Sequence, residues 1–520
     1  MKVVTAEQMV ALEQASERAG VSTDTLMENA GLAVAQWARR LMGGAAAKRV
    51  LVLVGSGNNG ADGLVAARHL ARWGAQVSAY VVDHRPDPDP KMVWARAYGV
   101  AVTASGEDHG REMLDRQLAR CDLVIDAVLG TGRARPLAGP LLDTMSRLGM
   151  RSGHRRPALL ALDLPTGLNC DTGEVDPACP AADLTVALGR PKIGLLTFPG
   201  AAKVGRLEVA DIGLPSGLAE EGDIDVEMLT PGWVAAHLPA RPPDSHKGTF
   251  GHALVVAGSR NYVGAAYLAA QAAVRVGAGL TTLASPHGVY RIAAGKLTEV
   301  IHQPMAEDDQ GRFHPEASET IRGSLEGYTA MLVGCGLGWS EGTREFLENL
   351  LLAEPAPALP TVVDADGLNN LSQIPEWWQR IGGSVALTPH PGEMATLTGT
   401  STPDVQRDRI GAARKWSQRW NVTIALKGAN TVVAGPGCPL RISPFSNPGL
   451  ASGGTGDVLT GIIAGLMAQG LSPNIAVSCG VFLHGQAAEE VRQRMGDTGT
   501  IASDLIARLP ETIMELRQVS

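Results

Sequence analysis

The chain has 520 residues, of which 45% are hydrophobic and 4% are aromatic. A chain of this length usually forms two or three domains, and here their cores must consist mainly of Ala, Val, Leu and Ile. The formal net charge is -8 and Lys and Arg form no dense run, which argues against a nucleic-acid carrier. The N-terminal segment is polar, and no apolar run approaches the ~20 residues that span a bilayer. We therefore expect a soluble cytoplasmic protein with neither a nucleic-acid nor a membrane partner.

Short β-branched runs alternate with Ala-rich helical stretches along the whole chain, a pattern typical of βαβ units. The expected strands are 49–54, 76–82, 123–127, 158–163 and 183–187, followed by 252–257, 280–284, 328–333, 361–363, 385–387 and 423–426. An acidic stretch with Gly and Pro lies between the two series, at 214–225. We predict an α/β fold with two doubly wound, mainly parallel-sheet domains over residues 1–214 and 226–520. Ligands of such sheets bind at the carboxyl ends of the strands.

The first expected strand leads into a glycine-rich turn, LVLVGSGNNGADG. Gly55, Gly57 and Gly60 satisfy the GxGxxG pattern of dinucleotide-binding domains, which is weak evidence when it stands alone. Asp62 would place a carboxylate in the pyrophosphate site, where it repels phosphate unless a cation intervenes. The turn therefore favours a polar ligand with a metal ion, and a dehydrogenase is the weakest interpretation.

Later strand ends in the first half add further oxygen ligands. Asp126 ends the strand of DAVLGTG, and Asp163 ends that of LALDLPTG, with Thr166 in the turn that follows. Together with Asn59 these groups suit an alkali or alkaline-earth cation. Either aspartate alone would more often cap a turn or helix. Because they stand with Asn59 at three strand ends, we predict a site.

In the second half, NPGLASGGTGDVLTGIIAG predicts a glycine loop that opens an apolar helix. Free N–H groups at the start of that helix attract an anion, and the glycines let phosphate oxygens approach. Asp457 at the tip could accept a proton from a substrate hydroxyl as it attacks phosphorus. The plainer interpretation, a glycine turn that only caps a helix, is less favoured because Asp follows GGTG directly.

Three other strand ends of the second half carry polar groups. KGANT places Lys427 where nucleotide phosphates would bind. HPGE supplies His390, which suits a substrate hydrogen bond, and Glu393, which suits Mg²⁺ bound against phosphate. DADGLN supplies Asp364 and Asp366, which fit helix caps and metal-proximal acids equally well.

The motifs DTLMENAG, GSGNNGADG, DAVLGTG and LDLPTGLNCDTG together resemble the Rossmann-like epimerase domain of the bifunctional NAD(P)H-hydrate repair enzymes. The resemblance implies a potassium ion held by Asn59, Asp126 and Thr166, and we hypothesise that Asp163 moves the proton. Ala61 departs from the family pattern, which carries glycine there, and a methyl group is tolerated only at negative φ. The residues implied to contact the hydrated cofactor are Asn58, Asn59, Gly60, Ala61, Asp62, Gly130, Thr131, Gly132, Arg133, Ala134, Arg135, Pro136 and Asp163.

GGTGD, KGANT, HPGE and DADGLN resemble the ribokinase-like superfamily. With HKGTFG and AGSRNYVGAA, they resemble more narrowly its ADP-dependent NAD(P)HX dehydratases. Gly367 stands where alanine is commoner in that family. The resemblance implies that Lys427, Gly428, Ala429, Asn430, Thr431 and Gly456 bind the nucleotide. It further implies that Ala265, Gly338, His390 and Asp457 meet the hydrate, with Asp457 catalytic.

The resemblance implies an enzyme that epimerises R- and S-NAD(P)HX at C6 and dehydrates the S form. ADP is consumed to give AMP and phosphate. The expected cofactors are K⁺ and Mg²⁺, the expected ligands are NADHX, NADPHX and ADP, and we also expect a homo-oligomer. One alternative is a ribokinase-like small-molecule kinase, which would leave a stable phosphate ester. Another makes the first half a sensing or scaffold module, and the retention of Asn59, Asp126 and Asp163 counts against it.

Overall fold

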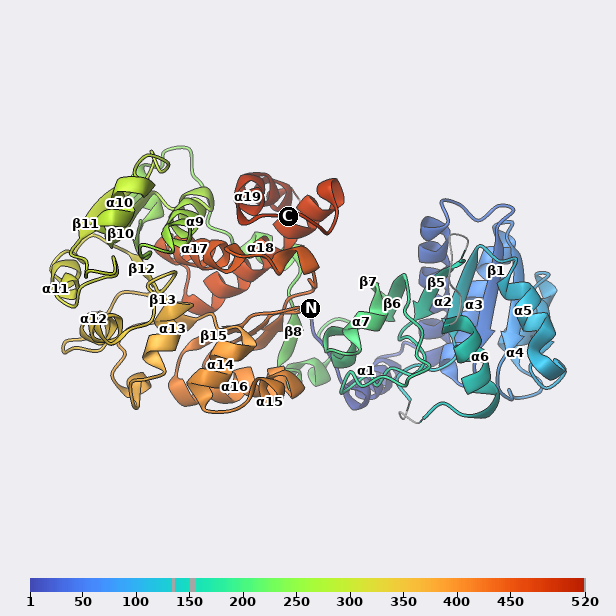
Figure 1. The fold of residues 1–520 in the computed structure, drawn as a ribbon. Coiled ribbons are helices and arrows are strands. Elements are labelled where there is room, and N and C mark those ends of the chain that lie inside the picture. The colour runs from blue at the N-terminus through green and yellow to red at the C-terminus, as the bar shows by residue number, and fades with distance from the viewer. Residues whose placement is uncertain (133–135, 150–155, 519–520) are drawn as a thin grey trace. The chain divides into compact units, whose positions relative to one another are not determined.

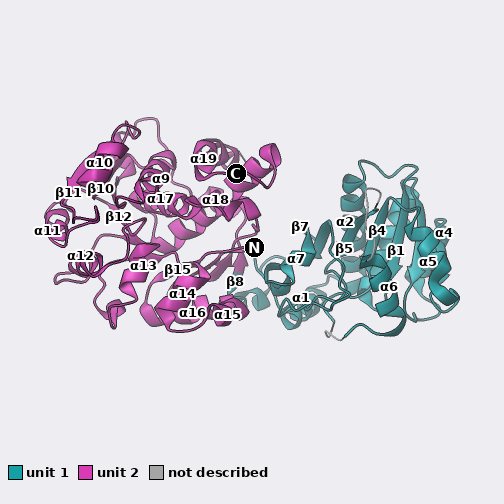
Figure 2. Ribbon diagram, viewed as in Figure 1, with its two compact units in different colours: residues 1–226 teal, residues 227–520 magenta. Residues whose placement is uncertain are grey.

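The computed structural model describes residues 1–132, 136–149 and 156–518. The chain divides into two compact units, Met1–Val226 and Glu227–Ser520, each built around its own sheet (Figure 2). The stretch 215–225 between the predicted domains therefore belongs to the first unit. In the described part of the chain, no helix combines the length and apolar character needed to cross a bilayer.

The first unit contains a seven-stranded sheet in the order β3-β2-β1-β4-β5-β6-β7, and every neighbouring pair is parallel (Figure 1). The strand order reverses direction between β1 and β4, which is where open α/β sheets bind ligands. This is the doubly wound, Rossmann-like arrangement that the sequence predicts. The strands are β1 (Arg49–Val54), β2 (Gln76–Val81), β3 (Ala101–Ala104), β4 (Leu123–Ala127), β5 (Ala158–Leu162), β6 (Leu184–Leu188) and β7 (Arg206–Ala210).

Both faces of this sheet are covered, as the apolar strand sequences require. Along β1, Val50, Val52 and Val54 belong to one buried cluster, while Leu51 and Leu53 belong to the cluster on the opposite face. The helices of the unit are α1 (Ala6–Arg18), α2 (Thr23–Leu41), α3 (Asn58–Arg72), α4 (Pro90–Ala97), α5 (Glu112–Leu118), α6 (Gly139–Gly149) and α7 (Ala201–Val204). Short 3₁₀ turns are η1 (His109–Arg111), η2 (Ile193–Leu196) and η3 (Ala219–Asp223).

The second unit contains a ten-stranded sheet in the order β11-β10-β9-β12-β13-β14-β15-β16-β17-β8. It is parallel from β11 to β15, and β16 then pairs antiparallel with both β15 and β17. The order reverses between β9 and β12. The strands are β8 (Val226–Met228), β9 (His252–Val256), β10 (Leu280–Pro286), β11 (Ile301–Met305), β12 (Ala330–Val333), β13 (Thr361–Val363), β14 (Val385–Leu387), β15 (Thr423–Leu426), β16 (Val432–Ala434) and β17 (Leu440–Ile442).

Helices and short 3₁₀ turns alternate with the strands of the second unit as they do in the first. Those of the second unit are α8 (Pro231–His237), η4 (Lys247–Phe250), α9 (Val263–Arg275), α10 (His287–Ala293), α11 (Ala317–Arg322), α12 (Glu341–Leu351), α13 (Asp366–Leu371), η5 (Trp377–Gln379), α14 (Pro391–Thr398), α15 (Thr402–Arg407), α16 (Arg409–Trp420), η6 (Pro448–Leu450), α17 (Thr455–Ala468), α18 (Pro473–Met495) and α19 (Ala502–Arg517).

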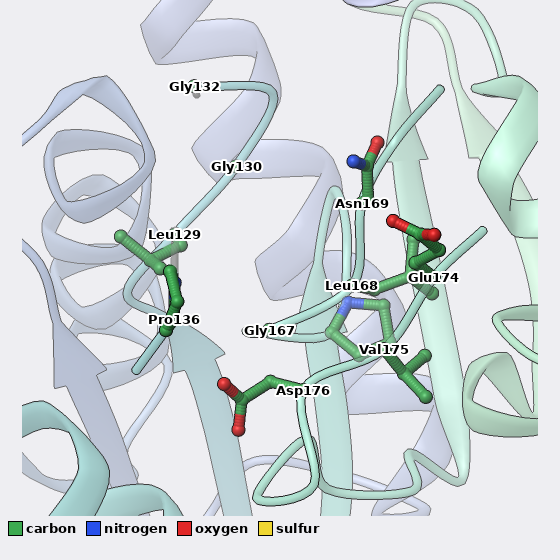
Figure 3. Close-up of a pocket in the computed structure, with 11 residues that line it drawn as sticks. Leu129, Gly130, Gly132, Pro136, Gly167, Leu168, Asn169, Glu174, Val175 and Asp176 are labelled. Carbon is green, nitrogen blue, oxygen red and sulfur yellow. The ribbon is translucent and has the colours of Figure 1, made fainter. Parts of the chain in front are cut away.

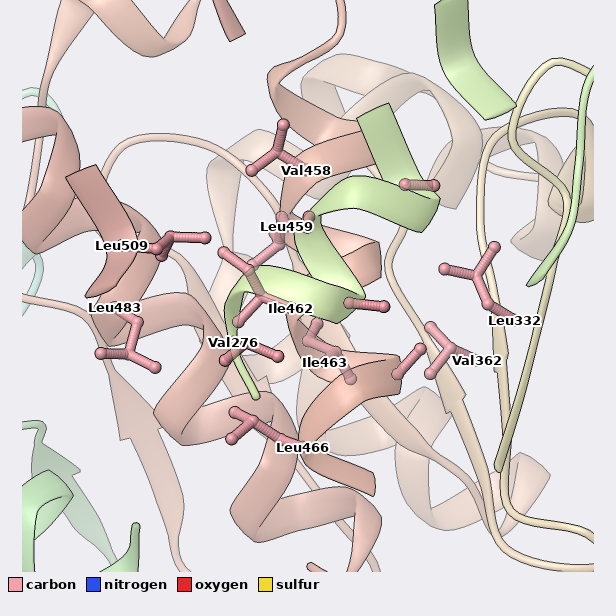
Figure 4. Close-up of a cluster of buried hydrophobic side chains, with 14 of the residues drawn as sticks. Val276, Leu332, Val362, Val458, Leu459, Ile462, Ile463, Leu466, Leu483 and Leu509 are labelled. Carbon is pink, nitrogen blue, oxygen red and sulfur yellow. The ribbon is translucent and has the colours of Figure 1, made fainter. Parts of the chain in front are cut away.

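Helix α17 lies in the centre of the second unit's core, among side chains from α9, α18, α19 and the sheet (Figure 4). Two glycines let it approach α9 closely. A Cβ on Gly461 would lie 2.2 Å from the Ala269 oxygen, and one on Gly465 would lie 2.4 Å from Val276 Cγ1. Because α17 is fixed along its length by this packing, the glycine loop at its N-terminus is held in place by the core.

Candidate active sites

The glycine turn after β1 is packed against the neighbouring strand end. A Cβ on Gly55 would lie 2.0 Å from the Val128 oxygen, and one on Gly60 would lie 2.1 Å from the Gly55 oxygen, so neither position accepts a side chain. Arg85 donates from one guanidinium nitrogen to the carbonyls of Gly55 (2.5 Å) and Gly57 (3.1 Å). Ala61 lies inside α3 and is not among the residues with positive φ. Its methyl group therefore does not strain the loop.

The three residues expected to hold potassium lie together at the ends of β1, β4 and β5. Thr166 donates to Asp126 through its hydroxyl (2.7 Å) and its backbone N–H (2.8 Å), and both side chains are fully buried. Asn59 lies beside the loop that follows β4, because a Cβ built on Gly130 of that loop would lie 3.2 Å from Asn59 Oδ1. The Asn59 Nδ2 atom is buried and has no hydrogen-bond partner in the described structure. Rotating that amide would present its oxygen instead, so the donor set fits a hard monovalent cation.

Asp163 adopts a left-handed backbone conformation, with φ of 67°. Its Oδ1 accepts hydrogen bonds from the Leu188 N–H (3.0 Å) and from the ammonium group of Lys192. Lys192 is 1% exposed and also donates to the Leu188 carbonyl at 3.0 Å. A strained, buried aspartate paired with a buried lysine at a sheet edge is typical of a functional site.

Asp62 and Glu13 lie near this ion pair. Asp62 is 6% exposed, and its Oδ1 has no hydrogen-bond partner in the described structure. Burial raises the pKa of Asp62 well above its ordinary value, and the carboxylates of Asp163 and Glu13 raise it further. Burial also raises the pKa of Glu13, which the Lys192 charge opposes. Three acidic groups therefore share one buried lysine.

A cavity of about 340 Å³ lies between the loops that follow β4 and β5 (Figure 3). Gly130, Gly132 and Pro136 lie on one side of it, and the segment 167–169 with 174–176 lies on the other. Thr131 belongs to the same loop. Arg133, Ala134 and Arg135, which the resemblance places against the hydrate, lie outside the described residues.

In the second unit, Asp457 lies in the first turn of α17, directly after the glycine loop. Burial, with the nearby charge of Asp364, raises the pKa of Asp457 to about 6. The Cys335 thiol, from the loop after β12, donates a hydrogen bond to Asp457 and lowers that pKa in part. A carboxylate poised near neutrality matches the requirement for a general base.

A chain of charged groups extends from Asp457 across the sheet edge. Asp364, which is 1% exposed, accepts hydrogen bonds from Lys427 Nζ (2.6 Å) and from Thr460 Oγ1 (2.6 Å). Lys427 Nζ lies 3.7 Å from Glu393 Oε2. Burial disfavours the lysine charge, but these two carboxylates outweigh it and raise the pKa of Lys427. The ammonium group is therefore held charged at the site expected for phosphate.

The KGANT turn is shaped by a buried arginine. Arg409 donates to the carbonyl oxygens of Leu426 (2.9 Å), Lys427 (3.2 Å) and Ala429 (2.7 Å), and its Nε is buried without a partner in the described structure. Burial lowers the pKa of Arg409 to about 10. Gly428 and Asn430 have positive φ, 137° and 51°. The carbonyls that Arg409 binds point toward its guanidinium, and its positive charge lies under the turn expected to hold ADP.

The residues expected to meet the hydrate lie at the β9/β12 reversal and beside α14. Ala265 is in the first turn of α9, and a Cβ on Gly336 would lie 2.9 Å from its side chain. The Gly338 N–H already donates to Asp366 Oδ2 at 2.9 Å. His390 Nδ1 accepts from the Glu393 N–H (3.2 Å), which leaves Nε2 as the donor.

Glu393 serves partly as a helix cap, because its Oε2 accepts from the His390 N–H at 2.7 Å. In the described ranges, no group of three or more His, Cys, Asp or Glu side chains could form a metal cage. Mg²⁺ commonly binds through one or two carboxylates together with substrate phosphates and water. The single carboxylate of Glu393 beside the expected phosphate position fits that kind of site.

Comparison with known proteins covers both units. Residues 253–511 match the family model described as NAD(P)H-hydrate dehydratase, and residues 23–194 match the one described as YjeF-related protein N-terminus. A bifunctional NAD(P)H-hydrate repair enzyme from Moorella thermoacetica is 39% identical over 528 residues, covering 100% of this chain and 98% of that relative. The chain belongs to the bifunctional NAD(P)H-hydrate repair enzyme family. Its Escherichia coli relative is 32% identical, covering 96% of this chain and 91% of that one.

A solved structure similar to the second unit is an ADP/ATP-dependent NAD(P)H-hydrate dehydratase from Bacillus subtilis, co-crystallised with ATP and Mg²⁺. It is 32% identical with a TM-score of 0.50, and the match covers 56% of this chain and 99% of that one. Membership of the repair enzyme family confirms the resemblance that the sequence motifs indicate, and the ribokinase-like fold of the second unit.

Several ionisable residues of this repair enzyme chain escaped the sequence analysis. They are Glu13, Lys192, Cys335 and Arg409. Each is remote in sequence from the group that it contacts, so motif spacing carries no signal for it. The hint available for Lys192 is its place in GRPKIG just after an expected strand end.

Proposed function

We propose that this chain repairs hydrated NADH and NADPH. The first unit interconverts R- and S-NAD(P)HX, and the second dehydrates the S form to NAD(P)H while ADP is converted to AMP and phosphate. The domains expected at 1–214 and 226–520 would carry these two activities. The observation that supports the proposal most is the pair of glycine-lined sheet edges with an acid at each, the buried Asp163 in one and the half-buried Asp457 in the other.

In the second unit, Asp457 would take the proton of the C6 hydroxyl as its oxygen attacks the β-phosphorus of ADP. The bond between that phosphorus and the bridging oxygen breaks, and AMP leaves. Inorganic phosphate then departs with the C6 oxygen as the N1 lone pair forms a C6=N1 bond, and loss of a C5 proton restores the reduced ring. Lys427 and the turn Gly428–Thr431, with Gly456, would bind the nucleotide phosphates. Ala265, Gly338 and His390 would position the hydrate.

Two metal ions would complete the sites. Magnesium, near Glu393, would neutralise charge on the transferring phosphoryl group. Potassium, held by Asn59, Asp126 and Thr166, would offset negative charge on the bound substrate. We further propose that the protein acts in the cytoplasm as a homo-oligomer.

The test is incubation of the purified chain with S-NADHX, ADP and Mg²⁺. Release of inorganic phosphate together with recovery of the reduced nicotinamide absorbance supports the proposal. A stable phosphate ester with no recovered absorbance would instead identify a small-molecule kinase. Incubation of R-NADHX without ADP, followed by chromatographic separation of the two epimers, tests the first unit separately.

A further inference from the structure

Four ionisable side chains from four separate elements lie near one another at the carboxyl edge of the first unit's sheet. Glu13 lies on α1, Asp62 lies in the first turns of α3, Asp163 follows β5 and Lys192 precedes η2. The pKa values of Glu13 and Asp62 are both shifted by the charges of other members of the group, Asp163 and Lys192 among them. One lysine cannot neutralise three carboxylates, so the acids must differ in protonation.

Asp163 is the acid that forms an ion pair with Lys192. The Lys192 ammonium and the Leu188 N–H both donate to the same oxygen of Asp163. Lys192 is 1% exposed, so water does not compete for the ion pair, and an unpaired ammonium at this depth would be costly. The second oxygen of Asp163, Oδ2, accepts no hydrogen bond from the part of the chain that the structure describes and remains available as an acceptor.

Asp62 is in the opposite situation. Its Oδ1 is buried without a hydrogen-bond partner in the described structure, and Lys192 is already engaged by Asp163. The charge of a second lysine, Lys91, also lowers the pKa of Asp62, but Lys91 forms ion pairs with Asp24 (2.7 Å) and Glu28 (2.6 Å). Burial without a cation in contact, beside a second carboxyl group, favours the neutral form of Asp62, and a neutral carboxylic acid is a proton donor. The raised pKa of Asp62 agrees with this.

We propose that Asp62 is the general acid and Asp163 the general base of epimerisation, with Lys192 as the positioning residue that assigns the proton to Asp62. The proposal rests on the epimerase function proposed above. Enzymes commonly obtain an acid and a base from two similar groups by placing them in environments that separate their pKa values.

The step balances without a further reactant. Asp62 gives its proton to the departing C6 oxygen, the C6–O bond breaks as the N1 lone pair forms C6=N1, and water leaves. A water molecule then adds to the other face of C6, and its proton passes to Asp163. Transfer of that proton from Asp163 to Asp62 restores the starting state, and the reverse reaction uses the same groups in exchanged roles.

The test compares three variants in epimerisation of R-NADHX without ADP. Asp62→Asn keeps the shape but cannot donate the proton, and we expect kcat to fall by about 10²–10⁴-fold with little change in KM. Glu17→Gln is the matched control, because it removes an exposed acid from the same helix as Glu13, outside the group of four, and it should stay within about threefold of wild type. Lys192→Met should shift the acidic limb of the pH–rate profile upward, and Lys192→Arg should restore it in part.

Reaction in ¹⁸O-water gives a second measurement that needs no variant. Label should enter the C6 hydroxyl in step with inversion, because the C6–O bond breaks. Inversion without label, or an Asp62→Asn variant that epimerises at the wild-type rate, would overturn the proposal. A wild-type chain that does not epimerise would instead overturn the proposed function, so the two failures are distinguishable.

Discussion

Lowering the pH from 8 to 5 should slow dehydration of S-NADHX about tenfold, because Asp457 must be ionised to accept the hydroxyl proton. With a pKa of about 6, Asp457 is ionised in about 99% of molecules at pH 8 and in about 10% at pH 5. With an ordinary aspartate pKa of about 3.9, more than about 90% would remain ionised at pH 5 and the rate would hardly change. Burial, assisted by Asp364, is the cause of the difference.

The assay measures kcat/KM from recovery of reduced nicotinamide absorbance, with saturating ADP and Mg²⁺, between pH 5 and 8. The ADP phosphates titrate in the same range, so a protein variant separates their contribution. Cys335→Ala removes a hydrogen bond that lowers the pKa of Asp457, and it should move the midpoint to higher pH. The matched control is Cys438→Ala, at an exposed position between β16 and β17, which should leave the midpoint unchanged. A wild-type midpoint below pH 4.5, or equal midpoints in both variants, would refute the assignment of Asp457.

Three further predictions concern the first unit. Folding raises the pKa of Asp62, so this residue lowers the free energy of unfolding at high pH. The loss is absent below the pKa of the unfolded state and grows as the pH rises toward the pKa of the folded state. Asp62→Asn should therefore raise the melting temperature at pH 8 and not at pH 4, and equal gains at both pH values would contradict this. Gly60→Ala should lower the free energy of unfolding by about 1–3 kcal/mol, since its Cβ would overlap the Gly55 carbonyl, and urea titration measures the loss. Replacing K⁺ by choline should slow epimerisation and leave dehydration unchanged, and Thr166→Val should weaken the K⁺ dependence; a K⁺-independent wild type would remove the proposed ion site.

The central strands of both sheets could be predicted from the sequence because they are buried on both faces. Strands such as β1 and β12 are continuous apolar runs that end at Gly or Asp. The outer strands were missed. β7 and β11 are edge strands with exposed or half-buried residues, and their sequences, RLEVA and IHQPM, lack an apolar run. β16 and β17 were also missed, because they pair antiparallel and follow β15 with no helix between, outside the alternation of strand and helix on which the prediction was based.

The residues at strand ends could also be predicted, because parallel strands bring their carboxyl ends to one edge. The pairing of Asp126 with Thr166, 40 residues away, follows from that rule. The groups that set the charge of the site could not be predicted in this way. Lysine is normally a surface residue, and only the path of the chain after β6 places Lys192 against Asp163. Arg409 begins a helix and is polar by sequence, yet the fold buries it under the KGANT turn.

The most direct test is a time course with an equimolar mixture of R- and S-NADHX in the presence of ADP, Mg²⁺ and K⁺. The wild-type chain should convert the whole mixture to NADH. Asp163→Asn should stop after the S half is consumed, and Asp457→Ala should equilibrate the epimers without forming NADH. Complete conversion by the Asp163→Asn variant, or NADH formation by the Asp457→Ala variant, would contradict the division of chemistry between the two sheet edges.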